Sequence, residues 1–266
     1  MESNEYLQKN KDSWNARTAY HLQSDFYDVP SFIKGKNSLN SIELELLGDV
    51  RAQNILHLQC HFGQDTLSLA RMGAEVTGID FSETAIQAAV DLSDKTGLSA
   101  QFLCCDLYHL PDCLQARFDT VFTSYGTIGW LPDMDAWAKV VAHFLKPGGK
   151  LVFVEFHPVV WMFDNDFTKI EYSYFNQAPI VETLSGTYAD QQAPIKHETV
   201  SWNHDLAEVL GALLKNGLSI TTFREYDYSP YPCFAKVVEK EPSKYYIRDM
   251  EHKIPMVYAV VAQKPH

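Results

Sequence analysis

The chain has 266 residues, of which 46% are hydrophobic and 21% are charged, and its formal net charge is −12. This composition is that of a folded globular protein and excludes a disordered tail, a collagen and a coiled coil. The acidic excess disfavours nucleic acid and anionic membrane surfaces as partners, because both carry many phosphates.

Residues 1–14 are polar and mixed in charge, unlike a secretory signal, and there is no apolar run of about 18 residues. The five cysteines include an adjacent pair but no CxxC motif, which indicates neither a disulfide framework nor a zinc site. We therefore expect a soluble, cytoplasmic protein with reduced thiols and no metal.

Residues 1–50 are polar, carry scattered aromatic side chains and show little strand signal, so they predict a helical cap. Within this cap, residues 42–47 predict an amphipathic helix that ends at Gly48. At about 150 residues per domain, the rest of the chain suits a single large α/β domain over residues 51–266.

From residue 54 onward, predicted strands and helices alternate. The strands are expected at residues 55–58, 75–79, 100–105, 118–124 and 151–156, and the helices at 65–72, 82–96 and 133–145. Ser82 is the expected N-cap of the second of these helices, and Gly97 ends it. This alternation predicts parallel strands with crossover helices on both faces of the sheet.

Residues 157–200 break the alternation, because they are rich in aromatic side chains and show no clear period. We interpret about 158–200 as an insertion. A helix over 205–216, a strand over 219–223, an irregular segment rich in Tyr and Pro, and a last strand over 256–261 are expected to follow.

The segment 54–73 predicts a strand that turns sharply near Gln59 and opens a helix near Asp65. In open α/β sheets, cofactors bind beyond the carboxyl ends of the strands, beside helix N-termini. Asp80 ends the next strand 17 residues after Gly63, so its carboxylate can accept hydrogen bonds from both hydroxyls of a ribose. Asp106 ends the third strand, where it suits either the adenine amino group or a turn.

Several motifs follow one another in a set order. They are Leu56-His-Leu-Gln-Cys-His-Phe-Gly, Gly73-Ala-Glu-Val-Thr-Gly-Ile-Asp-Phe-Ser, Cys105-Asp-Leu, Phe118-Asp-Thr-Val-Phe-Thr-Ser, Leu145-Lys-Pro-Gly-Gly-Lys-Leu and Pro255-Met-Val-Tyr-Ala-Val-Val-Ala. This order resembles the class I S-adenosylmethionine-dependent methyltransferases, strongly over 54–157 and more loosely over 200–264. The resemblance implies a Rossmann-like sheet of seven mostly parallel strands, helices on both faces, and an antiparallel last strand.

The resemblance also implies S-adenosylmethionine as the cofactor. The residues that would bind it are Gln59, Cys60, His61, Gly63, Asp80, Phe81, Ser82, Asp106, Leu107, Thr123 and Tyr125. The first loop is similar to a branch of the family that carries LHLQCHFG. Most members have an acidic residue at position 57 and glycines at positions 59 and 61.

Methyl transfer needs positioning and exclusion of water, and a hydroxyl or amine acceptor also needs a base. The candidate bases at strand ends are Tyr125, Glu155 and His157, and His204 opens the late helix. Each of the last three has a structural alternative: an ion pair for Glu155, a strand end for His157 and a helix start for His204. His57, Cys60 and His61 have no second cluster that would complete a metal site.

The aromatic residues Trp14 and Tyr20 of the cap and Trp161 of the insertion predict a lid over the acceptor, or equally a satellite hydrophobic cluster. The expected function is methyl transfer to an unidentified small molecule, and the oligomeric state stays open. Two alternatives remain. A nicotinamide-dependent Rossmann oxidoreductase would need a G-x-G-x-x-G loop, which is missing, and a methyltransferase-like fold could bind a partner without catalysis.

Overall fold

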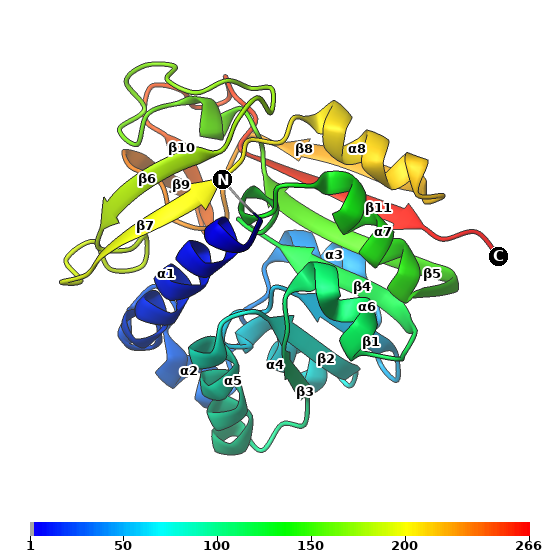
Figure 1. Cartoon of the computed structure of the whole chain (residues 1–266). Helices are drawn as coiled ribbons and strands as arrows, with labels where there is room; N and C mark the ends of the chain where they lie inside the picture. Colours follow the sequence, from blue (N-terminus) through cyan, green and yellow to red (C-terminus); the bar gives the residue numbers. More distant parts are fainter. Residues whose placement is uncertain (1–2) are drawn as a thin grey trace.

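The computed structural model describes residues 3–266, so residues 1 and 2 of the expected cap lie outside it (Figure 1). Within the described chain, seven strands form one sheet in the order β3-β2-β1-β4-β5-β11-β8. They are β1 (Asn54–Leu58), β2 (Glu75–Asp80), β3 (Gln101–Cys104), β4 (Phe118–Ser124), β5 (Leu145–Phe156), β8 (Ser219–Tyr226) and β11 (Val257–Gln263). β11 runs antiparallel to both neighbours, which confirms the expected sheet.

Helices cover both faces of this sheet (Figure 1). α3 (Ser41–Leu47), α4 (Gln64–Arg71) and α5 (Glu83–Thr96) lie on one face, and α6 (Leu110–Cys113), α7 (Met134–Phe144) and α8 (Leu206–Lys215) lie on the other. Alternate residues of β1 serve the two faces: Leu56 and Leu58 pack towards α7, and Ile55 packs towards α3 and α4. Both core layers therefore meet at β1, directly below the first loop.

The ends of the elements follow local chemistry. The Ser82 hydroxyl caps α5 by accepting from the Ala85 N–H at 3.1 Å, and Gly97 ends the helix in the left-handed conformation, as expected. β5 begins at Leu145, earlier than the expected residue 151, because its pairing with β4 shifts register between Phe118 and Thr120 and so takes in the Pro-Gly-Gly turn. Three short 3-10 turns join the elements: Leu107–His109, Ile128–Trp130 and Val160–Met162.

A cover lies across the carboxyl ends of the strands. It consists of α1 (Ser3–Gln23), α2 (Val29–Ile33) and the hairpin β6 (Ile180–Ser185)–β7 (Lys196–Ser201), with α1 beside β7 (Figure 1). A second hairpin, β9 (Val237–Glu241)–β10 (Lys244–Ile247), follows β8. Both hairpins fall in segments for which the sequence predicts no regular structure.

The side-chain pattern of β6 explains why the sequence does not predict this strand. Ile180, Glu182 and Leu184 face inward, while the residues between them are exposed. A charged residue on the inward face and the exposed Val181 on the outer one mask the alternation that marks a half-buried strand.

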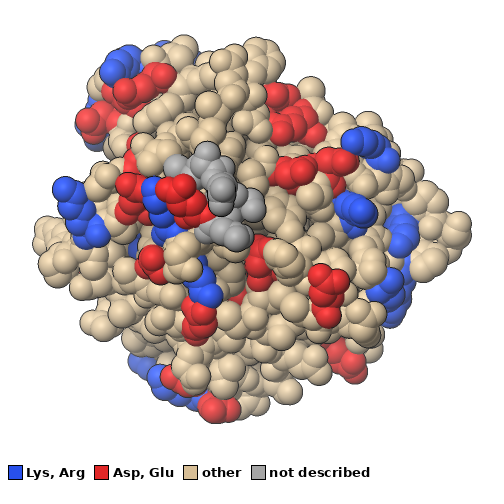
Figure 2. Space-filling view, in the orientation of Figure 1, with Lys and Arg blue, Asp and Glu red and all other residues tan. Residues whose placement is uncertain are grey.

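The acidic surface is not a single field. Figure 2 shows acidic side chains spread over one face, several of them next to basic ones. One ion pair, Lys9–Glu198, joins α1 to β7. No helix within residues 3–266 combines the length and the apolar character needed to cross a membrane.

Candidate functional site

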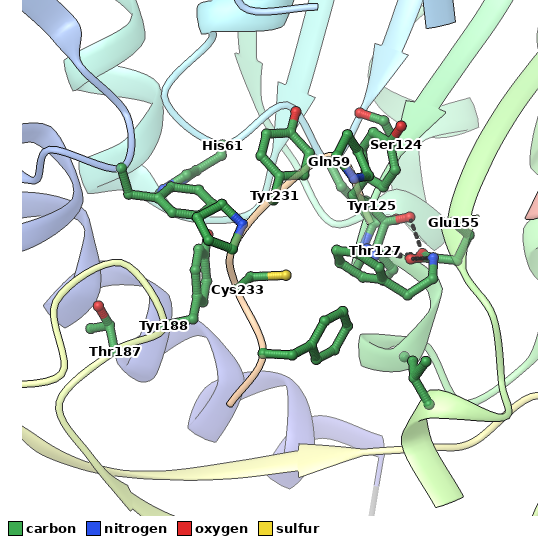
Figure 3. A pocket seen from close by; sticks show the side chains of 18 of the residues that line it. Gln59, His61, Ser124, Tyr125, Thr127, Glu155, Thr187, Tyr188, Tyr231 and Cys233 are labelled. Carbon is green, nitrogen blue, oxygen red and sulfur yellow. Dashed lines mark hydrogen bonds between the residues drawn. The ribbon is translucent and has the colours of Figure 1, made fainter. Parts of the chain in front are cut away.

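A cavity of about 1310 Å³ lies between the sheet and the cover. Its floor is formed by the loops that follow β1, β2 and β4, and its walls by α1, the β6–β7 hairpin and residues 228–235 (Figure 3). Single drug-sized ligands fill about 300–1,000 Å³. The cavity is therefore large enough for a nucleotide-sized cofactor and a small acceptor together.

The first loop keeps the backbone of a glycine-rich turn without the glycines. Gln59 and His61 adopt left-handed φ values of 54° and 50°, at the two positions where the resemblance leads one to expect glycine. Each such residue is strained by about 1–2 kcal/mol, and strain of this kind gathers at functional sites.

Gly63 has a different reason to be glycine. Its φ is +79°, and a Cβ atom there would lie 2.8 Å from the Phe102 ring and 2.9 Å from the Ala89 Cβ. The residue therefore lets α4 and α5 close against β3, in addition to lining the cavity.

Two polar side chains of the floor have hydrogen-bonding capacity left for a ligand. Gln59 donates from Nε2 to the Thr127 carbonyl at 2.9 Å, while its buried Oε1 has no partner among the described residues. Asp80 accepts from the His61 N–H at 2.8 Å and the Ser82 N–H at 2.9 Å, one on each carboxylate oxygen. A carboxylate accepts about four hydrogen bonds, so both oxygens of Asp80 can still take a hydroxyl. Burial raises the pKa of Asp80 to about 6.

The residues that the resemblance assigns to the cofactor divide into two groups. Those that line the cavity are Gln59, Cys60, His61, Gly63, Asp80, Phe81 and Tyr125. Those that are not among its described lining are Ser82, Asp106, Leu107 and Thr123. Ser82 is occupied as a helix cap, Asp106 pairs with His109 at 2.7 Å, Leu107 belongs to the core, and the Thr123 hydroxyl donates to Thr127 at 3.2 Å.

Among the candidate bases, Tyr125 faces the cavity and is hydrogen-bonded to a buried carboxylate. Its hydroxyl donates to Glu43 Oε2 at 2.8 Å. Glu43 lies on α3 and is fully buried; burial, and next the neighbouring Asp65, raise its pKa to about 7. Burial and Glu43 raise the pKa of Tyr125 well above its usual value, so the phenol keeps its proton and Glu43 is the group that can change charge.

Glu155 anchors the loop after β4. Its carboxylate accepts from the backbone N–H groups of Gly126, Thr127 at 2.7 Å, Ile128 at 3.2 Å and Phe156 at 2.7 Å (Figure 3). The sequence predicts either a general base or a buried carboxylate paired with a nearby cation. Backbone donors occupy the carboxylate instead, because the loop turns directly over the end of β5.

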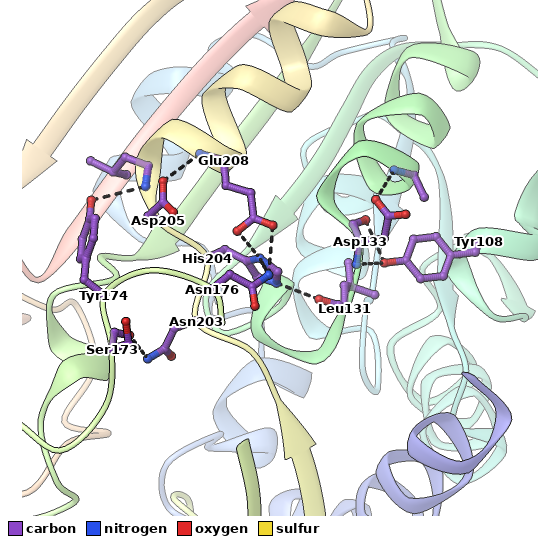
Figure 4. A network of polar contacts seen from close by, with 12 residues as sticks. Tyr108, Leu131, Asp133, Ser173, Tyr174, Asn176, Asn203, His204, Asp205 and Glu208 are labelled. Carbon is purple, nitrogen blue, oxygen red and sulfur yellow. Dashed lines mark hydrogen bonds and ion pairs between the residues drawn. The ribbon is translucent and has the colours of Figure 1, made fainter. Parts of the chain in front are cut away.

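The two histidine candidates have structural contacts. His157 Nε2 lies 3.0 Å from Glu225, and the residue is not among the described lining of the cavity. His204 reaches the cavity wall, but its ring nitrogens contact the Leu131 carbonyl at 2.7 Å and Glu208 at 2.9 Å (Figure 4). Among the described residues, these contacts account for both ring nitrogens of His204, and His157 lies outside the cavity lining.

The three aromatic residues expected in a lid do not all reach the cavity. Trp14 and Trp161 line the cavity, whereas Tyr20, partly exposed on α1, is not among the described lining. Trp14 lies 5.1 Å from the His61 ring and 5.5 Å from the Trp130 ring, both edge to face. Trp14 therefore sits directly on the first loop.

Several residues that line the cavity are not predicted from the sequence. They are Arg17, Trp130, Tyr231 and Cys233. Arg17 could have been found, because it follows Trp14 by one helical turn and so shares a helix face with it. Tyr231 and Cys233 lie in the irregular segment after β8, which carries no periodic signal.

His57, Cys60 and His61 do not converge on a point. His57 Nδ1 pairs with the Thr66 hydroxyl at 2.8 Å, whereas His61 Nε2 pairs with His21 Nδ1 at 2.9 Å. Burial lowers the pKa of His57 to about 3, so this ring is neutral in the core. In the part of the chain that the structure describes, no group of three or more His, Cys, Asp or Glu side chains could hold a metal ion.

Comparisons with known proteins agree with this geometry. Residues 55–149 match a family model described as a methyltransferase domain. A ubiquinone biosynthesis O-methyltransferase of Coxiella burnetii is 30% identical over 135 residues, which are 50% of this chain and 57% of the relative. The chain thus matches little more than half the length of that curated relative.

Two solved structures share the fold. One, a Listeria monocytogenes protein assigned to the S-adenosylmethionine-dependent methyltransferases, has a TM-score of 0.62 and 21% identity over 84% of this chain and 95% of the other. The second is DhpI in complex with SAH (S-adenosylhomocysteine), with a TM-score of 0.59 and 20% identity over 100% of both chains.

Proposed function

We propose that this chain, which belongs to the class I S-adenosylmethionine-dependent methyltransferases, transfers a methyl group from S-adenosylmethionine to a hydroxyl of an aromatic small molecule. One observation carries the proposal. The loops after β1, β2 and β4, all within the matched domain, meet at a single cavity large enough for two ligands.

The floor of this cavity fits the cofactor. Asp80 has acceptor capacity for the two ribose hydroxyls, and the unpartnered Oε1 of Gln59 suits the amino group of the methionine end. When bound, S-adenosylmethionine supplies an electrophilic methyl group on a sulfonium. Gln59 is held by the Thr127 carbonyl and Asp80 by the His61 N–H, so both side chains present a preformed surface to it.

Tyr125 and Glu43 provide a route for the acceptor's proton. A hydroxyl that hydrogen-bonds to the Tyr125 oxygen can pass its proton there while Tyr125 passes its own to Glu43 Oε2. With its pKa raised to about 7, Glu43 exists in both charge states near neutral pH, as a general base requires.

Aromatic side chains around the cavity favour an aromatic acceptor. Trp161 and Phe234 pack 5.5 Å apart, and Tyr231 lies 5.1 Å from Tyr125, edge to face. Flat aromatic ligands bind well against such rings. The curated relatives named as ubiquinone biosynthesis O-methyltransferases support the same acceptor chemistry.

Thermal unfolding with added ligands tests the proposal. At 100 times its dissociation constant, a ligand stabilises the fold by about 2.7 kcal/mol. In a chain of this size that raises Tm by roughly 5–10 °C. We expect S-adenosylhomocysteine to produce this shift and NAD to produce none, and we expect methyl transfer to at least one member of a panel of phenols. A shift with NAD alone would identify an oxidoreductase, and no shift with either would favour a binding protein.

A further inference from the structure

Arg17 is a buried cation that faces the cavity without an acidic partner. It lies on α1, is 4% exposed and belongs to the cavity lining. Within residues 3–266, no Asp or Glu carboxylate lies within ion-pair distance of its guanidinium. An uncompensated charge in such a position is destabilised by several kcal/mol, which is rarely kept without a reason.

The contacts of Arg17 fix its orientation and leave donors free. Nε and Nη2 both point at Nε2 of His197 on β7, at 3.1 and 2.7 Å. The guanidinium carbon lies 5.2 Å from the Trp14 ring centroid and 5.5 Å from that of Trp130. Nη1 makes no hydrogen bond to the described residues, and Arg17 lines the cavity. The fork is therefore held on one side and open on the other.

The groups around Arg17 do not supply the missing negative charge. Burial, and next the charge of Arg17, lower the pKa of His21 to about 3 and that of His197 to about 4, so both rings are neutral. Burial, and next the neighbouring His21, lower the pKa of His61 well below its ordinary value. Burial raises the pKa of Tyr188 to about 12 and that of Tyr27 further, so both phenols keep their protons. Arg17 is thus the only charged group in this part of the cavity wall among the described residues.

We propose that Arg17 is the binding site for a carboxylate group of a ligand in this cavity. A planar guanidinium with free donors suits a carboxylate, which accepts two parallel hydrogen bonds. The proposal rests on the proposed function, under which two molecules can bring a carboxylate: the methyl acceptor, as an aromatic acid flanked by Trp14 and Trp130, and the methionine end of the cofactor.

Calorimetric titration of the full-length protein tests the acceptor as the source. The probe is benzoate, and its uncharged control is benzamide, each titrated with S-adenosylhomocysteine present and absent. Hydrogen bonds to a charged group are worth about 1.5–3 kcal/mol, so we expect wild type to prefer benzoate by roughly tenfold or more. R17M should abolish this preference and R17K should reduce it, because lysine keeps the charge but not the fork.

A matched control separates this effect from general damage. Arg71 also lies over an aromatic ring, 4.5 Å from Phe32, and donates to two backbone carbonyls, but it is not among the described lining of the cavity. R71M should bind benzoate as wild type does. The comparison in wild type needs no variant, so it shows whether the cavity prefers a carboxylate even if R17M does not fold, and R17K then tests whether that preference depends on the guanidinium.

A second titration tests the cofactor as the source. Methylthioadenosine shares the nucleoside and thioether of S-adenosylhomocysteine but lacks its amino acid group. If the cofactor supplies the carboxylate, R17M should lower the affinity for S-adenosylhomocysteine by roughly tenfold and leave the affinity for methylthioadenosine unchanged. Equal affinities of wild type for benzoate and benzamide, together with unchanged S-adenosylhomocysteine affinity in R17M, would overturn the proposal. If the protein binds no S-adenosylhomocysteine, the proposed function fails, while the benzoate titration still decides the role of Arg17.

Discussion

At the scale of single residues, Asp80 has three properties that suit the proposed binding of a ribose. It ends β2 at the cavity floor, it is buried, and its two oxygens are oriented by backbone N–H groups on either side. The sequence predicts this residue because strand ends and spacing are local signals. It could not predict Glu43, because only the folded chain brings α3 to the Tyr125 hydroxyl.

Replacement of Asp80 should weaken cofactor binding. Asp80→Ala removes hydrogen bonds from a charged acceptor, so we expect the affinity for S-adenosylhomocysteine to fall by roughly 2–3 kcal/mol in a calorimetric titration. Asp91→Asn on the exposed side of α5, where Asp91 bonds only to Gln87, should leave the affinity unchanged. A folded Asp80→Ala protein with wild-type affinity would refute the assignment.

The raised pKa of Asp80 adds a pH dependence to the same measurement. The group is ionised above its folded pKa of about 6 and protonated below it. A protonated carboxyl loses acceptor sites, so the affinity of wild type for S-adenosylhomocysteine should decrease as pH falls through 6. In Asp80→Asn, which does not titrate, this decrease should be absent.

At the scale of elements, the loop from β1 to α4 shows which part of a glycine-rich turn is needed for folding. Gln59 and His61 stand where glycines are expected and are strained by their positive φ values. A side chain at Gly63 would in addition overlap neighbouring atoms. The sequence predicts the turn and its helix. It does not reveal that Gly63 faces Phe102 and Ala89, since these contacts join three separate elements.

Two glycine variants separate strain from crowding. Gly97→Ala places a Cβ in open space at φ +66°, so it should destabilise the protein by about 1 kcal/mol, from backbone strain alone. Gly63→Ala has the same backbone strain, and its Cβ would also lie only 2.8 Å from the Phe102 ring and 2.9 Å from the Ala89 Cβ. This crowding adds about 1–3 kcal/mol to the loss of stability. Urea denaturation measures the free energy of unfolding of both variants. Equal losses of this free energy would show that the elements around position 63 accommodate the methyl group at no cost beyond the backbone strain.

At the scale of the whole molecule, the sheet and its cover differ in how they could be predicted. The alternation of strands and helices between residues 54 and 156 follows from local periodicity, and the structure confirms it. The cover forms by contacts between segments far apart in the chain. α1 and β7 are joined by Asn10, whose side chain donates to the Val200 carbonyl at 2.7 Å and accepts from its N–H at 2.8 Å. Such pairing leaves no periodic trace in either segment.

Asn10 therefore offers a test of whether the cover moves as a lid. Its amide occupies the open edge of β7 as a neighbouring strand would, and it is buried. Asn10→Ala removes both hydrogen bonds, each worth about 0.5–1.5 kcal/mol. If the cover opens separately from the sheet, hydrogen exchange at the paired amides of the β6–β7 hairpin other than Val200 should accelerate roughly tenfold, while the amides of β1 and β4 keep their protection. S-Adenosylhomocysteine should also dissociate faster, because the hairpin forms one wall of the cavity. Gln8→Ala, on the same helix, removes only a bond to Asp12 on the surface and should change neither rate. Equal acceleration across β1, β4 and β7 would show instead that the cover and the sheet unfold as one unit, and that the cavity has no separate lid.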